Sequence, residues 1–139
     1  MAILPGNTRV KDQVASGQVI FGLTDTDDAH VALLAGSPVG IVFPDQKGYG
    51  TLILPNTIAV VKGCPHPHEA RLLVDYLVGK EVEEKLALGR SAQIPLHPGV
   101  KPPPALPELR RIKVMKVDYE KLADTYAHSS DVLKEIFLR

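Results

Sequence analysis

The sequence is short of the residues that mark several common classes of protein. It contains no tryptophan, and aromatic residues make up 5% of the 139 residues. Such a chain lacks the aromatic surface on which proteins stack single-stranded nucleic acid. Lysine and arginine total 16, as do aspartate and glutamate, so no overall field attracts nucleic acid or an anionic membrane. We therefore expect no nucleic-acid partner.

The chain also lacks long hydrophobic runs. No apolar stretch approaches the roughly 20 residues of a membrane span. The first residues, MAILPGNTR, do not place a basic region before a long apolar one, so we expect no signal peptide in this chain. Cys64 is the single cysteine, which excludes an internal disulfide and leaves the compartment undecided. The length is sufficient for one α/β unit over residues 1–139.

Motifs of common enzyme classes are missing as well. The glycine-rich segment 45–50 matches neither a P-loop nor a dinucleotide-binding fingerprint, and no nucleophile elbow is present. One local group, Cys64, His66, His68 and Glu69, suggests zinc, but structural zinc sites pair two separated ligand couples. Turn and cap roles are favoured there over metal binding. We expect no catalytic residue, no enzymatic activity and no resident cofactor.

The most informative stretch is GQVIFGLTDTDDAH, residues 17–30. Residues 19–23 form an apolar run typical of a buried strand, and three aspartates follow where a helix begins. Side-chain oxygens of Asp25 and Thr26 are suited to cap that helix, and Asp27 and Asp28 complement its dipole. The same carboxylates, at the carboxyl end of a strand, favour a cation, a metal or a solute rich in hydroxyl or ammonium donors. An EF-hand is excluded, because the glycine and glutamate it requires are His30 and Gly36 here.

Periodicity and turn residues predict the remaining elements. A helix over 9–16, capped by Asn7 or Thr8, precedes the stretch, and Gly36 closes the helix that follows Asp28. Pro67 is suited to begin another helix, which Gly79 interrupts and which resumes as far as Gly89. Strands are expected over 39–43, 51–54 and 57–61, a proline-rich connector over 101–107, a strand or extended arm over 112–117, and helices over 119–126, capped by Asp118, and over 132–138.

An ordered set of motifs resembles a known family. The segments GN, GLTDTDDA, PDQ-GTL-PNT, KG-PHP, DYL and AQIP look like the C-terminal portion of periplasmic solute-binding proteins of ABC transporters, and the resemblance covers residues 4–138. The nearest branch is the iron(III)-type, type II group. The resemblance implies an α/β lobe, with helices packed on a mostly parallel sheet, that is incomplete relative to the two-lobe parent. It also implies a hinge crossing around residues 44–56.

The resemblance implies a function and a place for the acidic stretch. A solute-binding component captures a small solute or metal ion between its lobes and delivers it to the permease subunits. Asp25, Thr26, Asp27 and Asp28 would then form one wall of the ligand cleft. Ferric-binding members hold iron with adjacent tyrosines near the positions of Thr26 and Asp27, and this chain has no tyrosine there. The metal, if one binds, is therefore undetermined.

Three further expectations follow from the resemblance. The parent protein would be periplasmic, or extracellular and lipid-tethered. A chain that holds parts of two lobes would expose apolar faces, and would repack into one unit or self-associate. The alternative function is an intracellular ligand-sensing regulatory domain built on the same lobe design.

Overall fold

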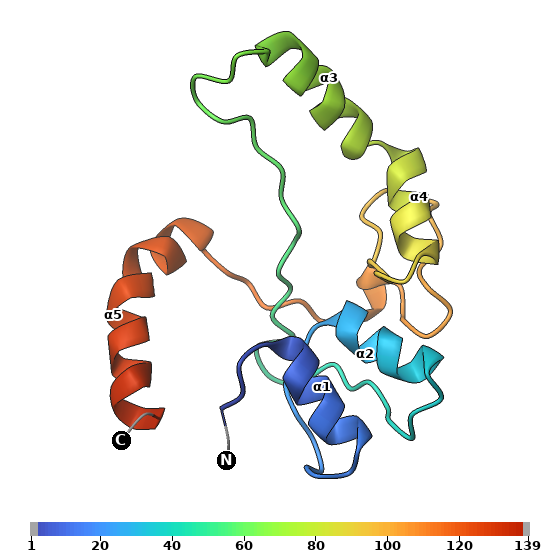
Figure 1. The fold of residues 1–139 in the computed structure, drawn as a ribbon, viewed down its shortest axis with the longest axis vertical. Coiled ribbons are helices and arrows are strands. Elements are labelled where there is room, and N and C mark those ends of the chain that lie inside the picture. Colours follow the sequence, from blue (N-terminus) through green and yellow to red (C-terminus); the bar gives the residue numbers. More distant parts are fainter. Residues whose placement is uncertain (1–2, 138–139) are drawn as a thin grey trace.

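The structure, a computed structural model, describes residues 3–137 as short helices joined by long extended segments (Figure 1). Helices α1 and α2 contact each other, and so do α3 and α4. No other described helix lies in contact with α5. The bounds are α1 Asn7–Ala15, α2 Thr26–Leu34, α3 Pro67–Leu77, α4 Lys80–Leu88, the 3₁₀-helix η1 Leu109–Arg111, and α5 Tyr119–Phe137.

Most helix ends lie where the local sequence predicts them. Asp25 caps α2, and Gly36, which follows its last turn, adopts a φ of 72° that glycine tolerates best. Pro67 occupies the first turn of α3, where its missing N–H costs no hydrogen bond. Gly79 separates α3 from α4, and Gly89 ends α4. These predicted boundaries are confirmed.

Two helices differ from the prediction. The N-cap of α1 is Gly6, so Asn7 and Thr8 lie inside the helix and their side chains are available for other partners. The two C-terminal helices expected over 119–126 and 132–138 are one continuous helix, α5, within the described residues; residue 138 lies outside them. Ser129 and Ser130 have only modest helix propensity, but no glycine or proline interrupts the segment. Asp118 does cap this helix, because its carboxylate accepts from the Lys121 N–H at 3.2 Å.

The apolar runs expected as strands do not form a sheet in the part of the chain that the structure describes. Between residues 3 and 137, strand-like pairing is limited to one parallel bridge, between Thr51 and Val114. The Thr51 N–H donates to the Lys113 carbonyl at 2.8 Å, and the Met115 N–H donates to the Thr51 carbonyl at 2.9 Å. A strand is stabilised by a neighbour that satisfies its backbone, and the other apolar runs have none among the described residues. The parallel sheet and the lobe that it would build therefore stay a prediction.

The side chain of Gln46 adds hydrogen bonds at the point where the 44–51 and 113–115 segments cross. Its amide nitrogen donates to the Lys113 carbonyl at 3.2 Å, and its amide oxygen accepts from the Lys113 N–H at 2.7 Å. Gln46 also donates to the Thr51 hydroxyl at 2.8 Å, and that hydroxyl donates to the Pro44 carbonyl at 2.7 Å. The 44–51 turn is thus joined to the 113–115 segment by side-chain as well as backbone hydrogen bonds.

The buried core is small and much apolar surface stays exposed. Buried apolar residues of the described chain include Ala32, Ala87, Ala92, Val100, Leu106 and Ile112. By contrast, Ile20 is 97% exposed and Phe21 is 82% exposed. The solvent-accessible surface is 11043 Å², whereas a compact monomer of this mass exposes about 7,100 Å². The chain therefore presents far more surface than a closed domain does.

None of the helices described here is both long and apolar enough to span a membrane.

Candidate functional site

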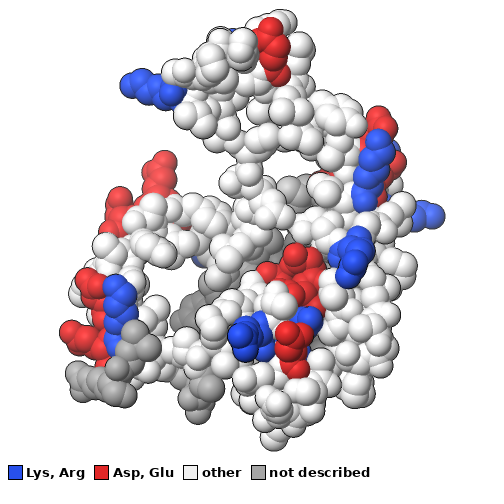
Figure 2. Space-filling model, in the orientation of Figure 1, with Lys and Arg blue, Asp and Glu red and all other residues white. Residues whose placement is uncertain are grey.

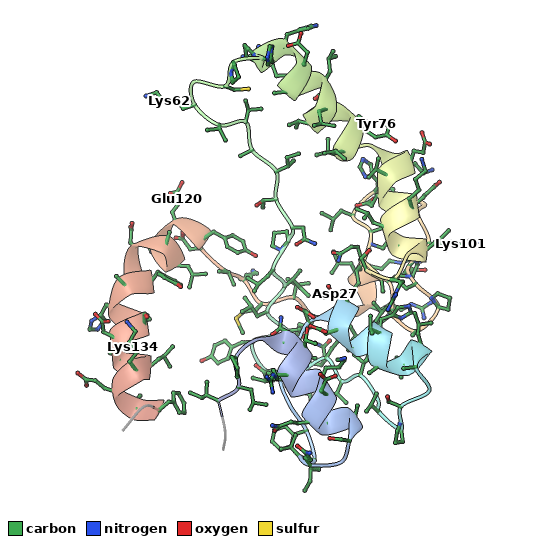
Figure 3. The ribbon with its side chains drawn as sticks, in the orientation of Figure 1. Asp27, Lys62, Tyr76, Lys101, Glu120 and Lys134 are labelled. Carbon is green, nitrogen blue, oxygen red and sulfur yellow. The ribbon has the colours of Figure 1, made fainter. Side chains whose placement is uncertain are left out.

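The acidic stretch lies where the N-terminal ends of α1 and α2 meet. Asp27 is placed at the start of α2, beside the beginning of α1 (Figure 3). The Asn7 side-chain amide, from the first residue of α1, donates to the Asp25 carboxylate. The Thr8 hydroxyl donates to the Asp28 carboxylate at 3.1 Å. Two helix N-termini, each carrying a partial positive charge, therefore share one group of carboxylates.

Asp25 acts as the cap that its position predicts. One carboxylate oxygen accepts from the Asp28 N–H at 3.2 Å, and the other accepts from Asn7. The Thr24 hydroxyl donates to the Asn7 carbonyl at 3.4 Å, which adds a third link between the two chain segments. Capping and cross-linking occupy the carboxylates of Asp25 and Asp28, so both have a structural role.

The pKa values of Asp25 and Asp27 are displaced in opposite directions. Partial burial acts to raise the pKa of Asp25, but hydrogen bonds from Asp27, the Asp28 N–H and Asn7 outweigh it and hold this pKa below its ordinary value. The pKa of Asp27 is raised, first by its hydrogen bond with the Asp25 side chain, then by burial and by the Asp25 charge. A proton retained by this pair thus resides on Asp27, facing the carboxylate of Asp25.

Of the four predicted site residues, the structure places Asp25, Asp27 and Asp28 in one hydrogen-bonded group. Thr26 begins α2 between them and is half-buried. Sequence reasoning missed Asn7 and Thr8 as members of this group, because it assigned them to capping their own helix. The position of Asn7 in the GN segment of the ordered motif set was the available signal.

His30 lies one turn further along α2 and is half-buried. Its Nδ1 atom is shielded from solvent and has no hydrogen-bond partner among the described residues. Within that same part of the chain, no three histidine, cysteine, aspartate or glutamate side chains are arranged to hold a metal ion. Cys64, His66 and His68 are therefore not gathered into a ligand set. The acidic group offers oxygen atoms to a cation, but no preformed metal centre.

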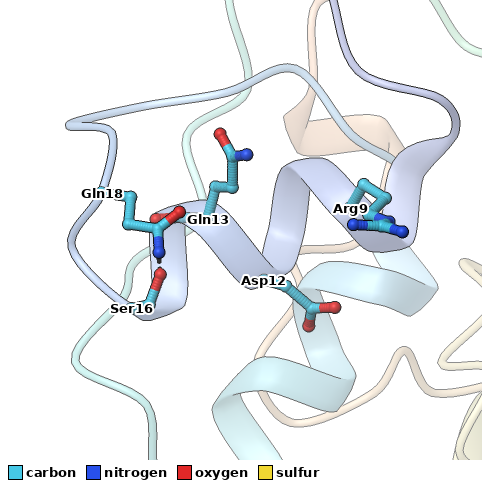
Figure 4. A pocket seen from close by; sticks show the side chains of 5 residues that line it. All are labelled: Arg9, Asp12, Gln13, Ser16 and Gln18. Carbon is cyan, nitrogen blue, oxygen red and sulfur yellow. Dashed lines mark hydrogen bonds between the residues drawn. The ribbon is translucent and has the colours of Figure 1, made fainter.

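A polar hollow of about 340 Å³ lies along α1, lined by Arg9, Asp12, Gln13, Ser16 and Gln18 (Figure 4). The Ser16 hydroxyl donates to the Gln13 carbonyl at 3.2 Å, and Asp12 pairs with Lys11 at 2.6 Å. None of the predicted site residues lines this hollow. Charged side chains of both signs gather over the α1–α2 region, without a field of one sign (Figure 2).

Comparison with known proteins defines the class of the chain. Residues 2–113 match the family described as bacterial extracellular solute-binding protein. This match spans most of the chain, so the chain belongs to the bacterial extracellular solute-binding protein family. No solved structure matches the chain.

Membership of this family supports the functional expectations at the level of the family as a whole. The chain is a substrate-binding protein of the ABC-transporter type, from a family that binds solutes outside the cytoplasm and works with transporter permeases. The family is one of binding proteins, not of enzymes. The iron(III)-type branch is a finer assignment than this match makes.

Proposed function

We propose that this chain is the C-terminal portion of the solute-binding component of an ABC importer, of the iron(III)-type, type II branch. The observation that carries the proposal is the family match over residues 2–113, which includes the whole acidic stretch. The expected design is an α/β lobe, incomplete relative to a two-lobe parent, over residues 1–139. The proposed location is periplasmic, or extracellular and lipid-tethered.

The proposed ligand-binding residues are Asp25, Thr26, Asp27 and Asp28, supported on the α1 side by Asn7. Asp27 is the best candidate for direct contact, since Asp25 and Asp28 already accept hydrogen bonds from the protein. Its raised pKa indicates a carboxylate whose charge is poorly compensated by the surrounding protein groups. A hard cation, or a small solute with ammonium or hydroxyl donors, would supply that compensation.

The proposed mechanism is closure of two lobes around the solute, followed by delivery to the permease. A ligand favours the closed form only as far as it contacts both walls. The hinge proposed over 44–56 gains support from the crossing at Thr51, where hydrogen bonds join the 44–51 turn to residues 113–115.

Thermal denaturation of the purified chain tests this proposal with four probes: ferric citrate, Ca²⁺, Zn²⁺ and spermidine. A ligand that binds only the folded state raises the midpoint, by an amount that grows with its concentration. We expect at least one probe to do so in the wild type and to have a smaller effect on Asp27→Asn. If no probe stabilises the wild type, the proposed preference for cationic or donor-rich solutes is contradicted.

A further inference from the structure

The C-terminal helix α5 has one face without charge and no helix packed against it. Its apolar and small residues recur at alternating spacings of three and four, the pattern of a coiled-coil seam. We call this row the α5 seam; its members are Tyr119, Leu122, Tyr126, Ser129, Leu133 and Ile136. Positions beside the seam are also uncharged, being Ala123, Thr125, Ser130, Val132 and Phe137.

Every charged residue of Tyr119–Phe137 lies away from the seam. These residues are Glu120, Lys121, Asp124, Asp131, Lys134 and Glu135. Lys134 pairs with Asp131 at 3.3 Å, so part of this charge is compensated on the same outer side. Charged side chains line the outer side of α5, which lies apart from the other helices (Figures 1 and 2). The helix therefore has the pattern of one that buries a single face, and the described chain leaves that face exposed.

The seam is open to a partner. Tyr126 is 74% exposed and Leu133 is 52% exposed. A groove of about 420 Å³ runs along these residues, with Ile3 of the N-terminal segment on its far side. Beyond Ile3, no described residue outside α5 lines this groove, and Lys134 is the one charged side chain in its lining.

Area and register point to a second copy as that partner. The whole chain exposes 11043 Å², about 3,900 Å² more than the compact expectation for its mass; the excess is spread over the described chain, and pairing of two copies through α5 would cover a part of it, since a standard interface takes about 800 Å² on each partner. Two copies of α5 laid antiparallel place Leu122 opposite Leu133, Tyr119 opposite Ile136, and Tyr126 opposite Ser129. The apolar pairs flank a central pair of hydroxyl groups, and a polar pair inside a seam fixes register.

Charge is consistent with the same arrangement. Antiparallel helices oppose their dipoles favourably. Thr125 then lies opposite Ser130, and Ala123 opposite Val132, so no like charges meet beside the seam. The α5 helix lies beyond residue 113, where the family match ends, so the match itself assigns it no role. We infer that the α5 seam is a self-association surface on which two copies of this chain pair as antiparallel helices.

Sedimentation equilibrium of the full chain over about a hundredfold range of concentration tests the association. We expect a mass that rises from one chain to two. Leu133→Glu, on the seam, weakens the association by at least about tenfold, since it buries an unpaired charge. The matched control is Leu72→Glu on α3, at a leucine that is 57% exposed, and it leaves the association unchanged. A monomer at every concentration, or a dimer lost only in the control, overturns the proposal.

Cross-linking decides the orientation and remains informative even if Leu133→Glu unfolds the chain. In a Cys64→Ser background, separate Leu122→Cys and Leu133→Cys chains are prepared, mixed and oxidised. Antiparallel pairing predicts that the two kinds of chain link to each other and that neither links efficiently to itself. Like-with-like linkage, or no linkage in a mixture, overturns the proposed pairing.

Discussion

Asn7 and Asp25 form the contact on which the acidic site depends. The amide of Asn7 holds the cap of α2 from the first turn of α1, although 18 positions separate the two residues. Such a link orders two helix ends at once. It also leaves Asp27 as the carboxylate of the group with the least compensation from the protein.

A double-mutant cycle measures this link. Asp25→Ala is expected to lower the free energy of unfolding by about 1 kcal/mol through loss of the cap. Asn7→Ala is expected to cost a similar or smaller amount, about 1 kcal/mol, because the bond is exposed. The double variant is expected to lose less than the sum of the two, with a coupling of about 0.5 kcal/mol or more in urea denaturation. Strict additivity would contradict the contact.

Glu83 holds the loop that follows α4 in place by accepting three hydrogen bonds. Its carboxylate accepts from the Leu96 N–H at 2.6 Å, from the His97 N–H at 2.7 Å, and pairs with the His97 ring at 2.8 Å. Partial burial acts to raise the pKa of Glu83, but these donors outweigh it and hold the pKa below its ordinary 4.5. The stabilisation is therefore present above pH 4.5 and is lost as the pH falls through the lowered pKa of the folded state.

Glu83→Gln tests that sign. At pH 7 the variant is expected to be less stable than the wild type by about 2 kcal/mol, because hydrogen bonds to a charged group are the stronger ones. The difference is expected to shrink as the pH falls below 4.5. Urea denaturation at several pH values measures it, with Glu84→Gln on the same helix as the control. A difference that does not depend on pH would contradict the account.

At the scale of elements, the crossing at Thr51 depends on a glycine. Gly50 has a φ of 99°, and a Cβ placed there would lie 2.6 Å from the Lys113 carbonyl oxygen and 2.8 Å from the Val114 carbonyl carbon. Only glycine allows the two segments to approach this closely. Gly63 has a similar φ of 81° but no atom within 4 Å of such a Cβ.

These two glycines separate backbone strain from contact. Gly63→Ala is expected to destabilise the chain by about 1 kcal/mol, through the positive φ alone. Gly50→Ala is expected to cost more, about 3 kcal/mol, because it also forces residues 113–115 away from Thr51. Thermal denaturation compares them, and equal losses would show that the crossing contributes nothing.

Sequence reasoning predicted helices far better than strands in this chain. The ends of α2, α3 and α4 are encoded locally by Asp25, Pro67 and Gly79, whose effects act within one turn. A strand depends on a neighbour that can be distant in sequence, and runs such as 19–23 have no such neighbour in the structure described here. The hydrogen bond between Asn7 and Asp25 was missed for the same reason, because residue spacing along one helix does not predict contacts between two helices.

At the scale of the whole molecule, the chain combines a large exposed surface with membership of a solute-binding family. The chain belongs to a solute-binding family and presents apolar side chains, such as Ile20 and Phe21, that other surfaces are expected to cover. The central claim is narrower than this: the carboxylates at the start of α2 contact the solute. If these carboxylates only stabilised the helix start, a substitution of Asp27 would not change the affinity for the ligand.

Titration calorimetry tests that claim most directly, with whichever of ferric citrate, Ca²⁺, Zn²⁺ and spermidine stabilises the wild type. Three proteins are compared: the wild type, Asp27→Asn, and the control Asp124→Asn on the outer side of α5. Asp27→Asn is expected to weaken binding by about tenfold or more, because a charged contact contributes about 1.5 kcal/mol or more. The control is expected to bind as the wild type does. Unchanged affinity in Asp27→Asn would contradict a ligand role for the acidic site.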